Sequence, residues 1–185
     1  LRDVPLPAID ARIEALRAAA VVGDALPPSD LQLLRRLLVK HAVFGVDRSP
    51  MAVELARISL WLSSFVPGLP LSVLDANLRC GDSLIGVDRV ERVLERVGLL
   101  APLIEAPLQQ AVREVAVAAG RQDTSLDEID ATQSAIRSAE RAAAPARRLL
   151  DAYTAVGFGV KGASDLIDDD ASARAILSGD TPGRD

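Results

Sequence analysis

Hydrophobic residues recur at helical spacing along most of this chain, and two short apolar runs interrupt that pattern. Residues 8–22 carry apolar side chains three or four positions apart with charges between them, which predicts an amphipathic helix. Residues 29–40 predict a second helix, because Ser29 and Gln32 have the spacing of a capping box. Both helices precede the first apolar run.

The first apolar run predicts a strand that ends at an acid and is followed at once by a helix. Residues 42–47, AVFGVD, favour a short strand, and Ser49 and Pro50 then provide an N-cap and a proline at the first helical position. The new helix carries apolar residues that step by four and three, and we expect this stripe to be buried. The stripe consists of Met51, Leu55, Ile58, Leu62 and Phe65.

The second apolar run predicts another strand, and the sequence beyond it is helical. Residues 72–80 favour a strand, and a turn-forming Gly-Asp-Ser triplet follows it. Residues 88–156 show helical periods with a kink or break expected near Pro145, which indicates a helical hairpin or a small bundle. Residues 157–185 have the polar, loose composition that is typical of a solvated tail or linker.

Together these elements predict a mixed α/β fold. We expect part of a Rossmann-like arrangement, with strands near 42–47 and 72–80 and a predominantly helical insertion. The expected organisation is an α/β core over residues 1–87, the insertion over 88–156 and the loose tail over 157–185. Composition agrees with this prediction: hydrophobic residues make up 49% of the chain and aromatic residues only 3%, which favours an aliphatic, helical core.

Charge and cysteine content narrow the function classes. The net charge of -5 argues against a free-standing nucleic-acid-binding domain held by a basic face. Cys80 is the only cysteine, which excludes an internal disulfide and a thiolate zinc site, favours a reducing compartment, and suggests a small buried side chain. No apolar run reaches the roughly 18 to 20 residues of a membrane span, and no signal peptide is evident, so we expect a cytoplasmic protein without a membrane partner. The leucine at position 1 hints at a piece of a longer chain.

Several other residues favour structural roles over chemistry. His41 is the only histidine and is expected to be structural or exposed. Trp61 lies next to the apolar stripe and is expected to pack against the core. Arg35, Arg36 and Lys40 form a small basic cluster on a helix, where such charges are usually solvated.

Two acids follow the two predicted strands. Asp47 ends the first strand and Asp82 comes just after the second. In open α/β sheets, ligands bind beyond the carboxyl ends of the strands, where an acid can accept hydrogen bonds from ribose hydroxyls. The alternative for Asp47 is a purely local turn before Ser49. The pair of acids points to a nucleoside site more strongly than either acid does.

Residues 41–86 combine, at fixed separations, an acid-ending strand, a PMAVELA helix start, an SLWL segment and an NLRCGDSLIG turn. The whole run is HAVFGVDRSPMAVELARISLWLSSFVPGLPLSVLDANLRCGDSLIG. It closely resembles S-adenosylmethionine-dependent adenine-N6 DNA methyltransferases, of the large single-chain type found in restriction-modification and in BREX or DISARM phage-defence systems. The resemblance covers about a quarter of the chain.

The resemblance implies roles for four residues toward S-adenosylmethionine. The acid matching Asp47 binds the donor's ribose, the acid matching Asp82 receives the amino group of its adenine, and Arg48 and Ser83 would line the adenine pocket. The family's glycine-rich loop and its Asn-Pro-Pro-Tyr or Phe motif, which grips the flipped adenine, do not occur in this sequence. The resemblance therefore implies a fragment without catalytic residues of its own, inactive alone and meeting double-stranded DNA only through a full-length enzyme.

Two other interpretations compete with this one. The first is a non-catalytic helical protein-interaction or spacer module, formed by the long and alanine-rich residues 88–156 on a small α/β support. The second is a nicotinamide-dependent dehydrogenase, which needs a glycine-rich loop about 20 residues before Asp47, where residues 17–30 offer only Gly23. A sheet that lacks strands would also expose an edge, so self-association through that edge is expected.

Overall fold

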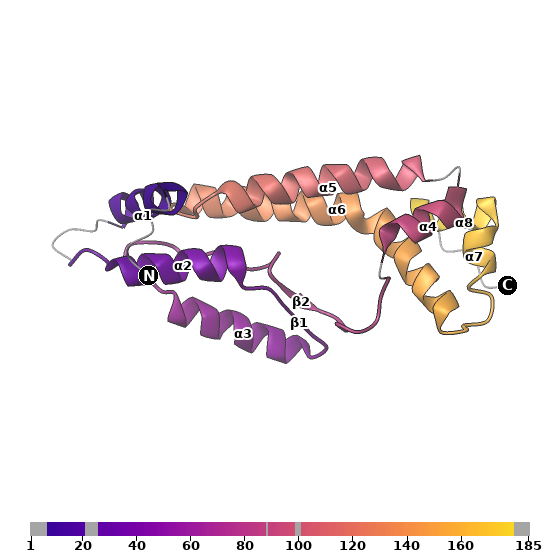
Figure 1. Cartoon of the computed structure of the whole chain (residues 1–185), viewed down its shortest axis with the longest axis horizontal. Helices are drawn as coiled ribbons and strands as arrows, with labels where there is room; N and C mark the ends of the chain where they lie inside the picture. The colour runs from indigo at the N-terminus through magenta and orange to yellow at the C-terminus, as the bar shows by residue number, and fades with distance from the viewer. Residues whose placement is uncertain (1–6, 21–25, 88, 99–100, 180–185) are drawn as a thin grey trace. The chain divides into compact units, whose positions relative to one another are not determined.

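The computed structural model describes residues 7–20, 26–87, 89–98 and 101–179, which are mainly helical (Figure 1). A small parallel sheet of two strands makes this described part a mixed α/β structure. The described elements in chain order are α1 (Pro7–Ala19), α2 (Asp30–Ala42), β1 (Gly45–Asp47), α3 (Pro50–Ser63), β2 (Leu78–Cys80), α4 (Val90–Val97), α5 (Pro102–Gly120), α6 (Leu126–Gly157), α7 (Asp165–Asp168) and α8 (Asp170–Ser178).

The chain divides into two compact units. Unit 1 comprises residues 1–81 and 116–136, and unit 2 comprises residues 82–115 and 137–185. The expected boundary near residue 87 therefore differs from this division, because the C-terminal end of α5 and the N-terminal end of α6 join unit 1.

Helices α1 and α2 form the first part of unit 1 as the sequence predicts. The capping box of α2 is confirmed: the backbone N–H of Ser29 donates to Gln32 Oε1 at 2.9 Å, and Gln32 N–H donates to Ser29 Oγ at 3.4 Å. The two helices and the loop after α3 share an apolar core of Leu16, Ala20, Leu33, Leu37, Val66 and Leu69.

The predicted strand, acidic turn, helix and second strand are confirmed in unit 1. Strand β1 pairs in parallel with β2, and Asp47 lies opposite Cys80. Ser49 caps α3 by accepting the N–H of Ala52 at 3.3 Å, and Pro50 follows at the first helical turn. Both strands are only three residues long, so the predicted ranges 42–47 and 72–80 were too wide.

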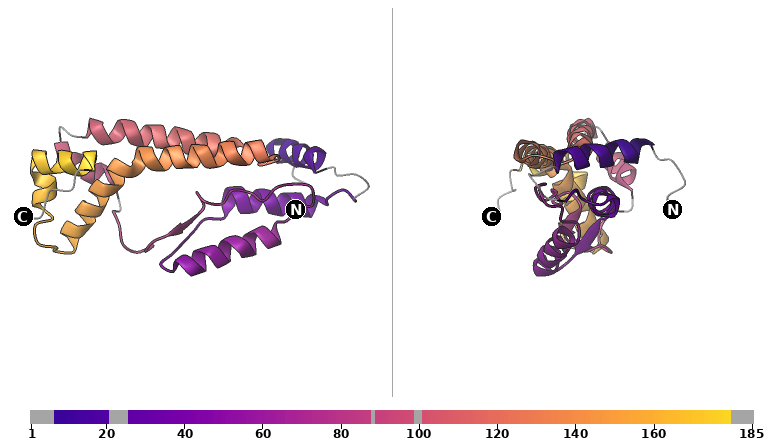
Figure 2. Two further views of the ribbon diagram at one scale, coloured as in Figure 1. Left: turned by 180° about the vertical axis from the view of Figure 1, so that it is seen from behind. Right: turned by 90° about the vertical axis from the view of Figure 1, so that its left-hand side faces the viewer.

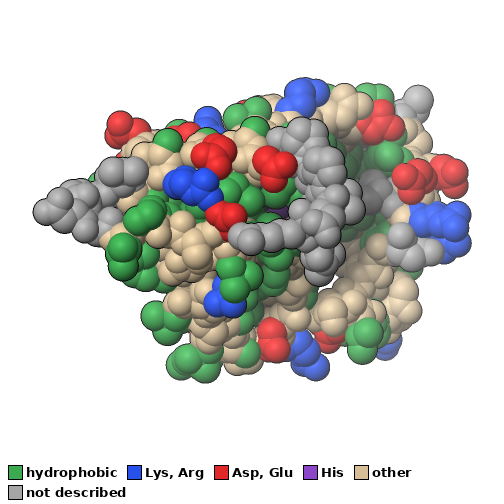
Figure 3. Space-filling view, turned by 60° about the vertical axis from the view of Figure 1, so that its left-hand side comes forward, with side chains coloured by type: hydrophobic (Ala, Val, Ile, Leu, Met, Phe, Trp, Pro, Cys, Tyr) green, Lys and Arg blue, Asp and Glu red, His purple; other side chains and the backbone are tan. Residues whose placement is uncertain are grey.

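The predicted burial of the apolar stripe on α3 is wrong. Its helical period is correct, yet all five residues of the stripe are exposed, from 47% for Ile58 to 75% for Leu62. Of the helix, only Val53 is buried. A parallel sheet is normally covered on both faces, and in the described residues this sheet has only two strands, so nothing there covers the stripe. Hydrophobic side chains also reach solvent on the face shown in Figure 3.

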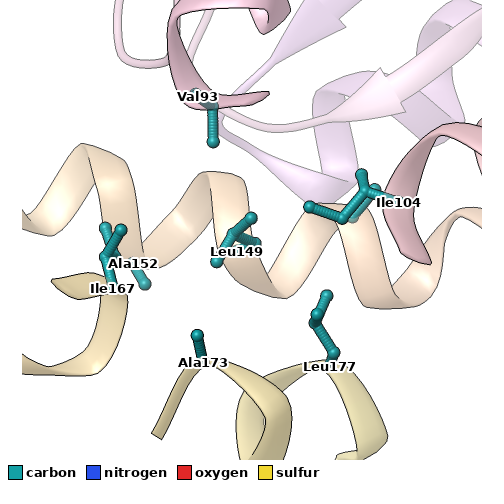
Figure 4. Packing of buried hydrophobic residues seen from close by; sticks show 8 residues of the cluster. Val93, Ile104, Leu149, Ala152, Ile167, Ala173 and Leu177 are labelled. Carbon is teal, nitrogen blue, oxygen red and sulfur yellow. The ribbon is translucent and has the colours of Figure 1, made fainter. Parts of the chain in front are cut away.

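Unit 2 is a helical cluster around an apolar core. Eight buried residues from α4, α5, α6, α7 and α8 meet there, and Figure 4 shows several of them converging. These residues are Val93, Ile104, Ala146, Leu149, Ala152, Ile167, Ala173 and Leu177. The ribbon of α6 bends in its C-terminal part but continues through Pro145, so the alternative of a break there is wrong (Figure 2).

The prediction of a loose tail over residues 157–185 is wrong for most of that range. Helices α7 and α8 lie within it, and Ile167, Ala173 and Leu177 are buried in the core of unit 2. The segment looked polar in part because acidic residues gather where its short helices begin, and Asp169 caps α8 by accepting the N–H of Ser172 at 2.8 Å. Residues 180–185 lie outside the described residues.

Candidate functional site

Asp47 lies at the carboxyl end of β1 and is exposed to solvent. Its Oδ1 accepts the backbone N–H of Ser49 at 2.7 Å, and its backbone carbonyl accepts the N–H of Gly81 at 2.9 Å. The first contact is the local turn that the sequence left open as an alternative. It uses one oxygen of a carboxylate that offers about four acceptor positions, so the group can still accept hydrogen bonds from a ligand.

Arg48 and Cys80 lie at the same end of the two strands. The Sγ of Cys80 approaches the carbonyl oxygen of Arg48 at 3.6 Å, which links the first residue after β1 to the last residue of β2. Both side chains are exposed, so the expectation that Cys80 is buried was wrong. The cysteine is exposed because it ends the short strand rather than lying inside a longer one.

Asp82 and Ser83 begin unit 2, immediately after Gly81. Asp82 is half-buried, and its Oδ1 accepts the N–H of Leu84 at 2.9 Å, again as a local turn. Ser83 is exposed. The structure thus brings Asp47 beside the end of β2 within unit 1, and the chain continues from that end into Asp82.

A second polar arrangement, a buried ionic cluster, lies inside unit 1. We call it the Asp123 cluster and define it by Arg36, Lys40, Asp123 and Thr132, all nine-tenths buried or more. Asp123 Oδ2 lies 2.6 Å from Lys40 Nζ, and Oδ1 accepts the hydroxyl of Thr132 at 3.0 Å. The backbone carbonyl of Asp123 accepts a guanidinium N–H of Arg36 at 2.8 Å. The carboxylate therefore compensates charge that α2 brings into the core.

Burial sets the protonation behaviour of the groups around this cluster. Desolvation lowers the pKa of Lys40, while the hydrogen bond and charge of Asp123 raise it in part. Desolvation likewise lowers the pKa of Arg36 against the attraction of Asp123. The pKa of His41 is lowered by desolvation first and then by the positive charges of Arg12 and Lys40.

His41 and Arg12 form a contact between α2 and α1. The guanidinium Nη1 of Arg12 lies 3.0 Å from His41 Nε2. Because an arginine only donates, His41 Nε2 accepts in this contact and the ring proton lies on Nδ1. Both residues border an apolar cavity of about 230 Å³ between the two helices. The structural role expected for His41 is thereby supported by a named partner.

The Asp123 cluster is what sequence reasoning missed. Arg36 and Lys40 were expected to be solvated, yet they are 2% and 7% exposed. A signal was present, because both share the helical face of Leu33 and Leu37, which form part of the core. No local pattern marks Asp123 as their partner, since it is 87 positions away from Arg36. Trp61 is half-buried, and its indole N–H donates to the carbonyl of Ser72 at 2.8 Å.

Neither protein-family models nor curated proteins nor solved structures match this chain. Within the described ranges, no group of three or more histidine, cysteine, aspartate or glutamate side chains is placed to hold a metal ion. None of the helices that the structure describes is long and apolar enough to cross a membrane.

Proposed function

We propose that this chain is part of an S-adenosylmethionine-dependent adenine-N6 DNA methyltransferase of the restriction-modification or phage-defence type. In this proposal β1 and β2 are two neighbouring strands of a Rossmann-like sheet, and α3 is the helix that connects them. The helices of residues 88–156 are an insertion in that domain. The chain supplies part of the donor site and no catalytic residue.

The parallel pairing of β1 with β2 is the observation that carries the proposal. Asp47 ends β1 opposite Cys80, and Asp82 follows Cys80 by two positions. Nucleoside-binding sites of open α/β sheets lie beyond the carboxyl ends of such strands. The parallel pairing supports the proposal because it brings the carboxyl ends of both strands to one edge of the sheet, which an antiparallel hairpin would not do.

The exposed edge of the sheet and the exposed stripe on α3 also support the proposal. Asp47 and Gly45 direct backbone groups toward β2, since Gly45 N–H donates to the carbonyl of Asn77 and Asp47 accepts from Gly81. The intervening Val46 directs its backbone groups to the opposite edge, which is unpaired in the two-stranded sheet of the described residues. This open edge and the exposed stripe on α3 are the surfaces that further strands of a larger sheet would cover.

The chain's own residues would act by binding and orientation. Asp47 would accept hydrogen bonds from the two ribose hydroxyls, and its turn with Ser49 holds the carboxylate at the strand end. Asp82 would accept from the adenine amino group, and Arg48 and Ser83 would take the roles in the adenine pocket that the resemblance implies for them. S-adenosylmethionine would supply the methyl group, and the grip on the flipped target adenine would come from outside these residues.

The coding DNA on both sides of this segment provides the first test. A strand with a glycine-rich loop upstream and Asn-Pro-Pro-Tyr or Phe downstream are expected. In the enzyme so defined, Asp47→Asn and Asp82→Asn should each raise the donor dissociation constant about tenfold to a hundredfold, because each loses a charge-assisted hydrogen bond. Asp130→Asn, an exposed change on α6, is the matched control. Unchanged donor affinity in both strand-end variants would refute the assignment.

A second candidate is a helical docking or spacer module, favoured by the wholly apolar core of unit 2. Residues 116–136 belong to unit 1, so a deletion of the whole insertion would also remove Asp123. A better test shortens α5 and α6 by seven residues each within 102–115 and 137–157. A docking role predicts loss of partner or DNA binding with unchanged donor affinity, and unchanged partner and DNA binding would contradict it.

A further inference from the structure

We infer that Asp123 is a positioning residue that holds the pairing of β1 with β2 from the connection between α5 and α6. No contact links Asp123 directly to either strand among the hydrogen bonds of the described residues. It acts instead through residues 72–77, the segment that leads into β2. The inference concerns strand pairing itself, and its consequence for donor binding rests on the function proposed above.

Asp123 holds the start of this segment. Its Oδ2 accepts the backbone N–H of Val73 at 3.0 Å while lying 2.6 Å from Lys40 Nζ. Its Oδ1 is engaged by Thr132, which fixes the orientation of the carboxylate. The side chain of Asp123 is fully buried, so water does not substitute for any of these contacts.

Asn77 holds the end of the same segment and joins it to the strands. Its side-chain amide donates to the backbone carbonyls of Lys40 at 2.9 Å and Val43 at 3.0 Å. The backbone carbonyl of Asn77 accepts the N–H of Gly45. Lys40 thus contacts Asp123 through its ammonium group and Asn77 through its backbone. Residues 72–77 are therefore held at both ends: Val73 through Asp123, which pairs with Lys40, and Asn77 through Lys40 and Val43.

The backbone of Asp123 shows that this placement has a conformational cost. Its φ is +56°, and among the described residues it is the one non-glycine residue with a positive φ. Aspartate and asparagine tolerate this region better than most residues, and glycine adopts it freely. Substitutions to asparagine and glycine therefore separate the loss of the carboxylate from backbone strain.

The test is amide hydrogen exchange on the chain of 185 residues, read at Gly45 and Gly81, whose N–H groups form bonds between the strands. Asp123→Gly relaxes the backbone but removes every side-chain acceptor, and we expect exchange at these two amides to rise about tenfold or more. Asp123→Asn retains an acceptor for the N–H of Val73, so a smaller rise is expected. Amides of α1 in the same unit serve as the internal reference.

A purely structural role would give a different result. If Asp123 only stabilised unit 1 globally, exchange would rise by the same factor in α1 as at Gly45 and Gly81, and the inference would be overturned. An unchanged rate at the two glycines would overturn it as well. If Asp123→Gly does not fold, the double variant Lys40→Met, Asp123→Asn removes both charges of the pair at once. Hydrogen exchange at Gly45 and Gly81 is then compared with that of α1 in the same way.

Donor binding is measured separately on the enzyme defined by the flanking coding sequence. Faster hydrogen exchange confined to Gly45 and Gly81, together with a raised donor dissociation constant in Asp123→Asn, supports both proposals. The same loosening in an enzyme that does not bind S-adenosylmethionine at all would remove the proposed function and leave the positioning role of Asp123 in place.

Discussion

The two units of this chain distribute polar and apolar residues in opposite ways. All the described polar or charged residues that are buried lie in unit 1, namely Arg36, Lys40, Ser64, Ser72, Asn77, Asp123 and Thr132. The buried residues that the structure describes in unit 2 are apolar, and an ion pair between Arg96 and Asp168 lies on its surface. Unit 1 meanwhile exposes the stripe on α3.

This difference shows what each unit depends on. The apolar core of unit 2 gains stability from packing of aliphatic side chains, which tolerates exchange of one aliphatic residue for another of similar volume. The polar contacts of unit 1 contribute less net stability, because two cations and a carboxylate lose their hydration on burial. Their effect is to specify one arrangement of α2, residues 72–77 and the α5–α6 connection.

The largest loss in the free energy of unfolding is expected from Asp123→Ala, in unit 1. This change leaves Lys40 and Arg36 buried without their carboxylate, and removal of one partner of a buried pair typically costs about 3 to 5 kcal/mol. Chemical denaturation followed by hydrogen exchange in unit 1 measures the loss. Asp130→Ala, at an exposed position of α6, should change the free energy of unfolding by no more than about 0.5 kcal/mol. Equal effects of the two changes would contradict the importance of the cluster.

Leu149→Ala should have the next largest effect and should act on unit 2. Leu149 is 1% exposed in the core of that unit, and truncation of a buried leucine costs about 2 to 5 kcal/mol through lost burial and the cavity left behind. Leu103→Ala is the matched control, because Leu103 is 53% exposed. Hydrogen exchange should accelerate in α4 and α8 while the amides of α1 change little. Equal acceleration in α1 would show that the two units unfold as one.

His41 should make the stability of unit 1 depend moderately on pH. Because its pKa is lower in the folded chain than its ordinary value near 6.5, the unfolded chain binds more protons below that pH. The stability of unit 1 should therefore be complete above about pH 6.5 and fall as the pH decreases toward the folded pKa, by at most about 1.4 kcal/mol per pH unit. His41→Gln should flatten this part of the denaturation profile, and an unchanged profile would reject the assignment.

The smallest effect on stability is expected from Leu62→Gln in the exposed stripe. Leu62 is 75% exposed, so the free energy of unfolding should change by no more than about 0.5 kcal/mol. Sedimentation should instead show weaker self-association than for the unchanged chain, because the stripe offers an apolar surface. Val53→Gln, at the buried position of the same helix, should destabilise unit 1 clearly. A stability loss at Leu62 as large as that at Val53 would mean that the stripe is covered.

Local patterns in the sequence predicted much of the fold. The caps of α2 and α3, the acid at the end of β1 and the order of the elements from α1 to β2 depend on neighbouring residues and could be predicted, whereas α7 and α8 were missed. The burial of the α3 stripe could not, because helical period does not identify what covers a face. Arg36 and Lys40 were misjudged for a related reason: their burial depends on Asp123, which is distant in sequence.

The separation of 87 positions between Arg36 and Asp123 also sets a time during synthesis. At about 5 to 20 residues per second, the ribosome adds the stretch from Arg36 to Asp123 in about 4 to 17 s. During that interval α2 exists without the carboxylate that neutralises its inner face, so Lys40 and Arg36 remain hydrated. The contacts that Asp123 makes with Arg36, Lys40 and the N–H of Val73 therefore form only after the connection between α5 and α6 has been synthesised.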